Sequence, residues 1–425
     1  MTRPRVFITG AGVASPLGTG KQCFFAGLRE ARSGVRVIRS FDASHFPVRI
    51  AGEVPDVDAV NLALPFPEAP ALRRDPKALF FVAAAREALA QALPQGSLAD
   101  AFDPCRVAMS VASGLEIFHT SDLVPHLRGA GLDKESLLRE LALHPANAFL
   151  QIPSHLAAEC VAREAGILGP SEVNVSACAA GTQALGEAFW LVRDGEVDAV
   201  LAGGFDSMVN PLGIGGFSLL GALSESNELM EGASRPFDAG RDGFVLGEGA
   251  AAFFLETEAS AKARDSHLLA EVKGYGSTMD AFRVSDPDEH QRGAVAAMRA
   301  ALHDAGLQPG DVDYINAHGT GTRKNDPAET RAIREVFGAT PPAVSSTKSQ
   351  IGHLIGGAGA VEAMALLFAF AEQTLPATIN LHRPDPECDL DYVPNRPRPA
   401  RVRVALSNSF GFGGQNACLI LGAPS

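Results

Sequence analysis

Short runs rich in β-branched residues alternate with Ala- and Leu-rich runs along almost the whole of this 425-residue chain. The first kind of run favours strands and the second favours helices, and their alternation is typical of an α/β fold. No long low-complexity linker separates them. Strands are expected at residues 5–9, 107–111, 173–176, 199–202, 249–256, 314–317, 344–346, 402–407 and 418–421, and helices at 79–92, 153–165, 179–193, 291–305, 327–337 and 358–372.

One combination of elements occurs twice. The strand at 173–178 leads directly into the helix that starts at residue 179. The strand at 344–348 leads through a Gly-rich turn into the helix that starts at residue 358. This weak internal repeat suggests that the chain has two similar halves, with a boundary near residues 257–264.

Charge and composition exclude several classes of function. The formal net charge of −13 argues against general nucleic-acid binding, because contacts to phosphates need a basic surface. The six cysteines are scattered without a Cys-x-x-Cys pair, which favours a reducing compartment. The apolar stretch 354–371 is interrupted by Glu362 and is therefore a poor membrane span. An N-terminal apolar run of about three residues is too short for a signal peptide. We expect a cytoplasmic protein without nucleic-acid or membrane partners.

Nucleotide-binding and zinc motifs are incomplete or missing. The run Gly-Ala-Gly at residues 10–12 follows a strand, but Ser15 stands where a dinucleotide fingerprint needs its third glycine, and Pro16 follows. The sequence contains no His-Glu-x-x-His motif. We expect no bound nucleotide cofactor and no metal.

Cys178 lies where a β-rich run, Val-Asn-Val-Ser-Ala-Cys, turns into a helical pattern. A thiol in the first turn of a helix faces unpaired backbone N–H groups and the positive end of the helix dipole. Both favour the thiolate and can bring the pKa of a cysteine well below about 8.5. From this run alone, a nucleophile and a buried apolar cysteine are equally good interpretations.

Two histidines have neighbours that suggest a cleft. His318 follows a strand in Asn-Ala-His-Gly-Thr-Gly-Thr, and His353 lies in Lys-Ser-Gln-Ile-Gly-His-Leu-Ile-Gly-Gly-Ala-Gly. The small residues around each allow a backbone or a ligand to approach closely. For a single histidine, a hydrogen-bonded place in the core is the common alternative, but these surroundings argue against it.

These segments resemble the β-ketoacyl-acyl carrier protein synthases, the type II condensing enzymes of fatty-acid synthesis. The resemblance runs from the strand and turn at 6–18 to the loop at 407–416 and includes Arg235-Pro-Phe-Asp and Arg241-Asp-Gly-Phe-Val-Leu-Gly-Glu-Gly. It implies a duplicated thiolase fold with five layers (α-β-α-β-α), usually built as a homodimer. Residues 1–258 would form the half that carries the cysteine, and 259–425 the half with both histidines and a gating loop.

The resemblance also implies a chemistry. Cys178 would accept an acyl chain from a carrier thioester. Malonyl carrier would then lose carbon dioxide, and its enolate would attack the acyl-cysteine, while His318 and His353 stabilise the charge on the thioester oxygen. No cofactor is implied beyond the phosphopantetheine that arrives on the acyl carrier protein.

The resemblance gives roles to further residues. Lys348 matches an active-site lysine and Glu329 its acidic partner, as a buried pair that orients the histidines. Phe412 matches a gating phenylalanine, whose backbone N–H would join that of Cys178 in an oxyanion hole. Five further residues match substrate-binding positions: Thr320, Thr322 and Phe410, with Leu115 and Phe217 in an acyl tunnel. A helix start that docks the carrier protein is matched by Arg73, Arg74 and Lys77, for which a solvated charge run is the alternative.

Three departures from the family pattern leave the acyl substrate open. Gly321 stands between the two threonines, a form that is commoner in polyketide ketosynthases; Glu116 and Ile117 replace two glycines, and Gln415 replaces a threonine. The ketosynthase of a dissociated polyketide or polyene pathway is therefore the alternative. Chain-length factors, which resemble the family, lack the cysteine, and degradative thiolases use a second cysteine as base.

Overall fold

The computed structural model describes residues 3–55, 74–94, 96–116, 124–128, 131–143 and 153–424. Its main sheet contains β1 (Val6–Ser15), β2 (Gly18–Thr19), β5 (Val107–Ser113), β8 (Ser171–Asn174), β9 (Ala199–Ser207), β10 (Glu248–Thr257), β11 (Ala270–Met279), β12 (Tyr314–Asn316), β13 (Ala343–Ser345), β16 (Val404–Gly411) and β17 (Gln415–Gly422). Its helices include α1 (Lys21–Arg29), α3 (Pro76–Ala92), α6 (Lys134–Leu143), α7 (His155–Ala165), α8 (Ala180–Arg193), α9 (Pro211–Leu219), α10 (Glu258–Ala263), α11 (Arg292–Ala305), α12 (Asn325–Phe337), α13 (Lys348–Ile351) and α14 (Ala358–Glu372).

The strand order repeats itself about a central pair. It runs β8-β5-β9-β10-β1 and then, in mirror order, β11-β17-β16-β12-β13, with β2 paired to β1. In each half the two strands nearest the edge pair in parallel with their neighbours, and the inner strands pair antiparallel. The halves are joined where β1 pairs with β11 over three residues of each strand. The arrangement is that of a duplicated α/β unit.

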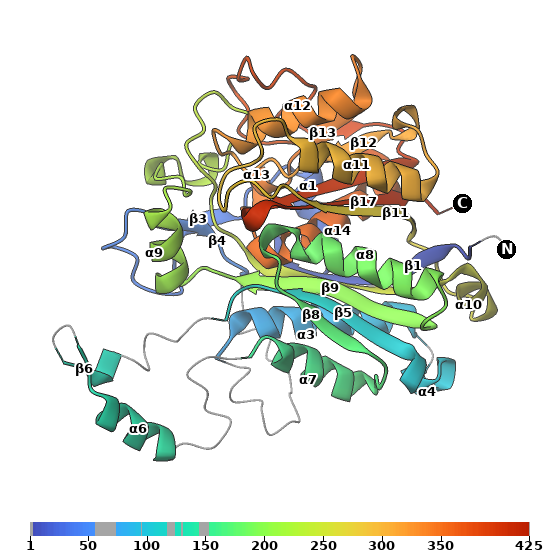
Figure 1. Cartoon of the computed structure of the whole chain (residues 1–425), viewed down its shortest axis with the longest axis horizontal. Helices are drawn as coiled ribbons and strands as arrows, with labels where there is room; N and C mark the ends of the chain where they lie inside the picture. The colour runs from blue at the N-terminus through green and yellow to red at the C-terminus, as the bar shows by residue number, and fades with distance from the viewer. Residues whose placement is uncertain are drawn as a thin grey trace.

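Helices and sheet halves alternate in five layers (Figure 1). α3 and α7 cover the outer face of one half, and α11 and α12 cover the outer face of the other. α8 and α14 lie between the halves and pack against each other. Separate apolar cores fill the outer layers, and the largest core surrounds the two middle helices.

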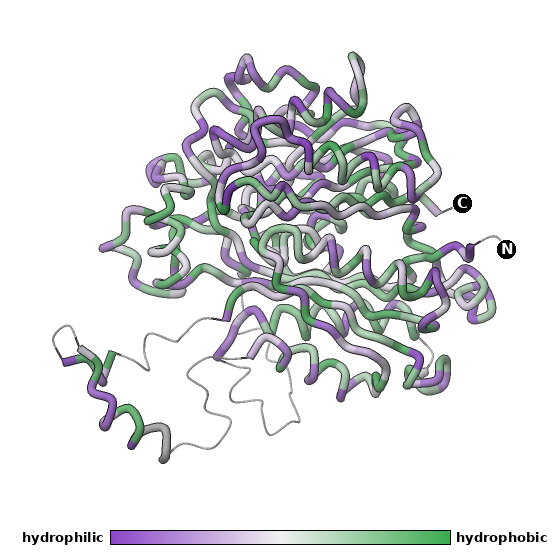
Figure 2. The backbone as a smooth tube through the Cα atoms, in the orientation of Figure 1, coloured by the Kyte–Doolittle hydropathy of each residue, from purple (hydrophilic) through white to green (hydrophobic). Residues whose placement is uncertain are grey.

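The middle layer explains the most apolar segment of the chain. Among the described residues, one helical stretch, Ile355–Glu372, is long and apolar enough to cross a membrane, but 89% of it is buried inside the molecule. It faces a sheet half on each side, and Figure 2 shows apolar colours around this centre. A helix buried on all sides is apolar all round.

The predicted α/β class and the duplicated five-layer architecture are confirmed. All nine predicted strands and all six predicted helices are present, most with shifts of a few residues at their ends. The sequence analysis missed β11, a central strand of ten residues, as well as α1 and α9.

Candidate active site

The site lies where the ends of equivalent strands from the two halves meet. Cys178 follows β8, His318 follows β12 and His353 follows β13 and α13, so all three lie beyond the carboxyl ends of parallel strands. α8 and α14 approach each other closely at their first turns. A Cβ built on Gly181 would lie 2.7 Å from the Ala360 nitrogen, so glycine is required there. This contact joins the segment that carries Cys178 to the segment that carries His353.

Cys178 occupies a strained turn. The preceding Ala177 has φ +50°, which is rare for a residue with a Cβ and costs about 1–3 kcal/mol. The thiol is 4% exposed. Its Sγ lies 3.1 Å from His353 Nε2 and accepts a hydrogen bond from the backbone N–H of Phe412. Two N–H donors therefore converge on this sulfur.

Neighbouring donors fix the tautomer of each imidazole. The backbone N–H of Ile355 donates to His353 Nδ1 at 3.2 Å, so the ring proton of neutral His353 is on Nε2, facing Cys178. Lys348 Nζ lies 3.3 Å from His318 Nδ1, and an ammonium can only donate. The ring proton of His318 is therefore also on Nε2. The two rings meet edge to face, with centroids 5.2 Å apart.

Burial and the charge of Lys348 keep both imidazoles neutral. Burial is the larger cause that lowers the pKa of His318 and of His353 well below the ordinary value, and the nearby ammonium lowers both further. Two neutral rings with Nε2–H groups pointing into one site can donate hydrogen bonds to an oxyanion but are poor bases.

The pKa expected for Cys178 is wrong for the free enzyme. Burial raises the pKa of the thiol to about 11, although Lys348 and the Phe412 N–H act in the opposite direction. The sulfur lies in a short turn just before α8, against the apolar side chains of Ile355 and Phe244, where the loss of solvent outweighs the helix start. At neutral pH the resting group is a thiol.

The predicted partner of Lys348 is also wrong. Lys348 forms an ion pair with Glu362 of α14, and both side chains are 1% exposed. Glu329 instead accepts the backbone N–H groups of His318 and Gly319, each at 2.8 Å. Asn408 donates to the same carboxylate at 3.2 Å. Glu329 thus holds the backbone that carries His318, and Glu362 balances the lysine charge.

A cavity of about 280 Å³ opens onto the cysteine. Thr320 and Thr322 line it, with their hydroxyl oxygens 3.0 Å apart. Phe410 lines it beside His318, and Phe412 stands at Cys178. The cavity lining therefore brings together these predicted site residues: Cys178, His318, His353, Glu329, Thr320, Thr322, Phe410 and Phe412.

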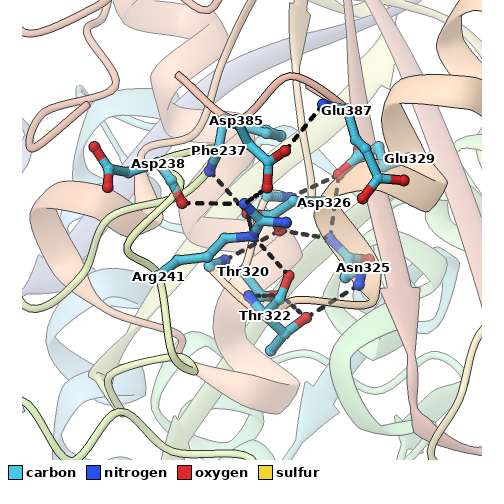
Figure 3. Close-up of polar contacts among 12 residues, drawn as sticks. Phe237, Asp238, Arg241, Thr320, Thr322, Asn325, Asp326, Glu329, Asp385 and Glu387 are labelled. Atoms are coloured by element: carbon cyan, nitrogen blue, oxygen red, sulfur yellow. Dashed lines mark hydrogen bonds and ion pairs between the residues drawn. The ribbon is translucent and has the colours of Figure 1, made fainter. Parts of the chain in front are cut away.

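A polar network holds the loop that carries the two threonines (Figure 3). Arg241 Nε donates to the Thr322 carbonyl at 3.1 Å and lies 3.5 Å from Asp326. Asp326 in turn accepts the backbone N–H groups of Gly321 and Phe237, at 3.1 and 2.8 Å. The two Arg-containing runs that carried the family resemblance thus fix the entrance loop of the cavity.

Other predicted positions lie outside this cavity. Phe217 of α9 stacks behind Phe412, with ring centroids 6.3 Å apart. Leu115 is 59% exposed and does not line the cavity, so the structure does not place it in a tunnel.

Three cations were predicted to dock the carrier protein, and the prediction is wrong for Lys77. Its side chain is 3% exposed, lies 3.4 Å from Asp75 and donates to the Leu115 carbonyl, because α3 is buried on nearly all faces. Arg74 is partly exposed, and Arg73 lies outside the described residues.

The sequence analysis missed two residues that shape the site. Glu362 had a signal, since it is the one charge inside an apolar helix whose other charge, Glu372, is its last residue. Phe244, whose ring meets His353 with centroids 5.2 Å apart, lies in the run from Arg241 that carried the family resemblance, but no role was predicted for it.

The cysteine and the two histidines are also residue types that bind metal ions. Donor atoms of Cys178, His318 and His353 lie within 4.8 Å of one another, a spacing that could hold a soft metal ion. The Lys348 ammonium on His318 opposes a second cation there.

Comparisons with known proteins agree with this site. Residues 3–261 match the family model "Beta-ketoacyl synthase, N-terminal domain", and residues 269–382 match "Beta-ketoacyl synthase, C-terminal domain". The chain is 41% identical to the 3-oxoacyl-[acyl-carrier-protein] synthase 2 of Synechocystis sp. over 99% of its length and 98% of the relative. It is also 41% identical to the protein of that name from Coxiella burnetii, over 99% of both chains.

Two solved structures are similar over the full length of both chains. One, the ishigamide ketosynthase/chain length factor, has a TM-score of 0.87 and 36% identity. The other, a type II polyketide ketosynthase bound to a hexaketide and in complex with its acyl carrier protein, has a TM-score of 0.83 and 32% identity. With both family models matched and relatives above 40% identity, the chain belongs to the β-ketoacyl synthase family, the condensing enzymes that transfer acyl groups.

Proposed function

We propose that this enzyme condenses a Cys178-bound acyl chain with malonyl-acyl carrier protein in fatty-acid elongation, giving β-ketoacyl carrier and carbon dioxide. The observation that carries the proposal is a thiol 3.1 Å from one of two buried, neutral imidazoles that both present Nε2–H. The curated relatives at 41% identity, named 3-oxoacyl-[acyl-carrier-protein] synthase 2, support it.

In the first half-reaction, Cys178 Sγ attacks the carbonyl carbon of the acyl-carrier thioester. The bond from that carbon to the pantetheine sulfur breaks, and the thiol proton of Cys178 ends on the departing pantetheine. The oxygen of the tetrahedral intermediate becomes negative, and the backbone N–H groups of Cys178 and Phe412 would donate to it. Removing one such donor typically slows a reaction by about 10²–10³-fold.

In the second half-reaction, malonyl carrier loses carbon dioxide, and the electrons of the broken C–C bond form an enolate. His318 and His353 would donate their Nε2–H groups to the enolate oxygen, which explains why the site keeps them neutral. The enolate carbon then attacks the acyl-cysteine carbonyl, and the Cys178 sulfur leaves as a thiolate, which takes up a proton from water to restore the resting thiol. The threonine hydroxyls at the cavity entrance, Thr320 and Thr322, would bind the pantetheine amides. No resident cofactor takes part in this scheme.

Phe412 is proposed as the gate between the two half-reactions. Its ring packs on Phe217, and the next two residues, Gly413 and Gly414, have φ of +80° and +75°. A loop with two such glycines can change its backbone angles at little cost, as lid hinges do. Opening would uncover the apolar cluster behind Cys178 for an acyl chain.

A polyketide or polyene chain is the second candidate substrate. Gly321 gives the loop Thr-Gly-Thr, and the chain is 36% identical to the ishigamide ketosynthase/chain length factor. The chemistry at Cys178 would be the same, and the acyl group would differ.

Intact-protein mass spectrometry distinguishes the two. The enzyme is incubated with carriers that bear saturated or polyunsaturated acyl groups of graded length, and the mass gained is followed with time. Fastest loading of saturated chains is expected. Fastest loading of polyenoyl chains would assign the enzyme to the polyketide or polyene pathway. No loading of any chain would contradict both proposals.

An acidic carrier protein needs positive charge near the cavity, and three exposed or partly exposed cations can supply it. Arg74 precedes α3 at the edge of the sheet where β5 ends, the same edge as Cys178. Arg323 and Lys324 line the cavity mouth, and Lys324 is tied to Asp286 at 2.7 Å. We propose Arg74 and Arg323 as carrier contacts, in place of the buried Lys77.

Charge reversal tests this docking. Arg74→Glu and Arg323→Glu are expected to raise the KM for acyl carriers about tenfold and to leave the KM for acyl N-acetylcysteamine unchanged, because charges at an interface rim chiefly affect encounter. Arg401→Glu is a matched control, since exposed Arg401 precedes β16 at the end opposite Gly411. Equal effects on both substrates would contradict the docking role.

We also propose a homodimer built on the edge strand β8. Within the described residues, β8 pairs only with β5, and Val175 beyond it is 52% exposed. An unpaired strand edge is a template for a second copy. Sedimentation at the mass of the 44.4 kDa single chain would contradict this.

A further inference from the structure

A buried carboxylate outside the cysteine-histidine cluster binds the turn next to His353. Asp206, near the end of β9, is 0% exposed. Its Oδ2 accepts the backbone N–H of Gly356 at 2.8 Å. Its Oδ1 is buried and has no hydrogen-bond partner among the described residues. A buried acid that accepts the backbone N–H groups of Gly356 and Ser207 and leaves its other oxygen without a partner calls for an explanation.

The turn that Asp206 binds is strained. Residues Ile355–Gly357 form a short helical turn, and Ile355 has φ +44°. A β-branched residue in this region is an outlier and persists only where its surroundings hold it in place. The N–H of Ile355 donates to His353 Nδ1, and the N–H of the next residue donates to Asp206. One turn therefore joins the carboxylate to the imidazole.

We propose that Asp206 is a positioning residue for the condensation, holding the Ile355 N–H on His353 Nδ1 through its bond to Gly356. This keeps the Nε2–H of His353 aimed at Cys178 Sγ. The inference rests on the roles proposed above for His353 and Cys178. It gives a reason for a buried acid near the end of β9.

The buried Lys77 completes this arrangement. Burial raises the pKa of Asp206 to about 6, while the charge of Lys77 and the Gly356 N–H act against that rise. Asp206 is therefore mostly ionised at neutral pH and makes a charge-assisted hydrogen bond, which is stronger than a neutral one. The lysine that does not dock a carrier instead helps to keep this acid charged.

Two substitutions separate the hydrogen bond from the charge. Asp206→Ala removes the acceptor, so the turn can relax and the His353 ring can move. We expect the kcat of condensation to fall about a hundredfold with little change in the KM for malonyl carrier, as for a misplacement of about 1 Å. Asp206→Asn keeps an oxygen for the Gly356 N–H and should recover most of that kcat.

Glu248 provides the matched control. It is buried on the neighbouring strand β10, burial raises its pKa to about 7, and it accepts from Ser207 and Val54. Glu248→Ala and Glu248→Gln remove a buried acid whose hydrogen bonds go to Ser207 and Val54 rather than to the turn, and kcat should stay near that of the parent at temperatures well below each variant's Tm.

The pH profile of Cys178 alkylation by iodoacetamide is a second readout. The negative charge of Asp206 raises the pKa of Cys178, so Asp206→Asn should shift the profile to lower pH. Glu248→Gln should not shift it. A kcat that survives in Asp206→Ala, or one that falls equally in Asp206→Ala and Glu248→Ala, would overturn the positioning role. Failure of the parent enzyme to condense any acyl carrier would instead refute the proposed function.

Discussion

Replacing Cys178 by Ser is expected to reduce acyl loading by at least about 10⁴-fold. A hydroxyl holds its proton more tightly than a thiol and is a weaker nucleophile, and His353, neutral with its proton already on Nε2, cannot take that proton. Intact-protein mass spectrometry with acyl carriers should show no added mass. Decarboxylation of malonyl carrier should continue, since both imidazoles remain in place.

The matched control is Cys160→Ser. Cys160 is buried in the outer-layer helix α7, away from the strand ends that form the site, and its replacement should leave loading unchanged. Loading of Cys178→Ser at the rate of the parent would show that another group carries the acyl chain. Loss of decarboxylation in Cys178→Ser would show that the serine disturbs the histidines as well.

Strands and helices with a clear pattern of apolar residues along the chain were predicted correctly. The prediction failed where contacts with distant parts of the chain determine the structure. Strand β11 was missed because its run Ala-Glu-Val-Lys-Gly-Tyr-Gly contains two glycines, which normally weaken a strand. The structure shows why they are there. A Cβ on Gly274 would lie 2.5 Å from the Ala301 carbonyl, and one on Gly276 would lie 2.3 Å from the Ala297 carbonyl. Close packing of α11 requires these glycines, and no local rule contains that contact.

The site was predictable where it depends on strand ends and uncertain where it depends on burial. Cys178, His318 and His353 each follow a strand, so their meeting follows from the duplicated topology. The pKa of Cys178 and the environment of Lys77 depend on how completely neighbouring layers exclude water. Spacing along the chain cannot show that, and both were predicted wrongly.

The acid that pairs with Lys348 was mistaken for the same reason. Glu329 is closer in sequence to His318 and matches the family pattern, whereas Glu362 looked like a break in an apolar run. Because α14 lies between the two sheet halves, its buried carboxylate, Glu362, needs a buried cation, and Lys348 is the partner.

Glu362→Gln is expected to destabilise the enzyme by about 3–5 kcal/mol, because the Lys348 charge is then left buried without its counter-ion. Lys348→Met should destabilise it by a similar amount and also lower the rate of malonyl decarboxylation. Without the ammonium at Nδ1, the tautomer of His318 is no longer fixed. The same ammonium lowers the pKa of both imidazoles, so its loss raises both values and brings protonation closer to neutral pH.

A double-mutant cycle identifies the acid. Denaturant unfolding of the double variant Lys348→Met/Glu362→Gln should show a coupling of at least about 1 kcal/mol, because each single change leaves the charge of the other residue buried and unpaired. Lys348→Met/Glu329→Gln should be additive within about 0.5 kcal/mol, since the main bonds of Glu329 are to the His318 and Gly319 backbone and to Asn408. Strong coupling of Lys348 to Glu329 and none to Glu362 would show that Lys348 pairs with Glu329, as the sequence pattern predicted. Coupling to Glu362 alone would mean that the middle-layer helix supplies the counter-charge of Lys348 beside His318.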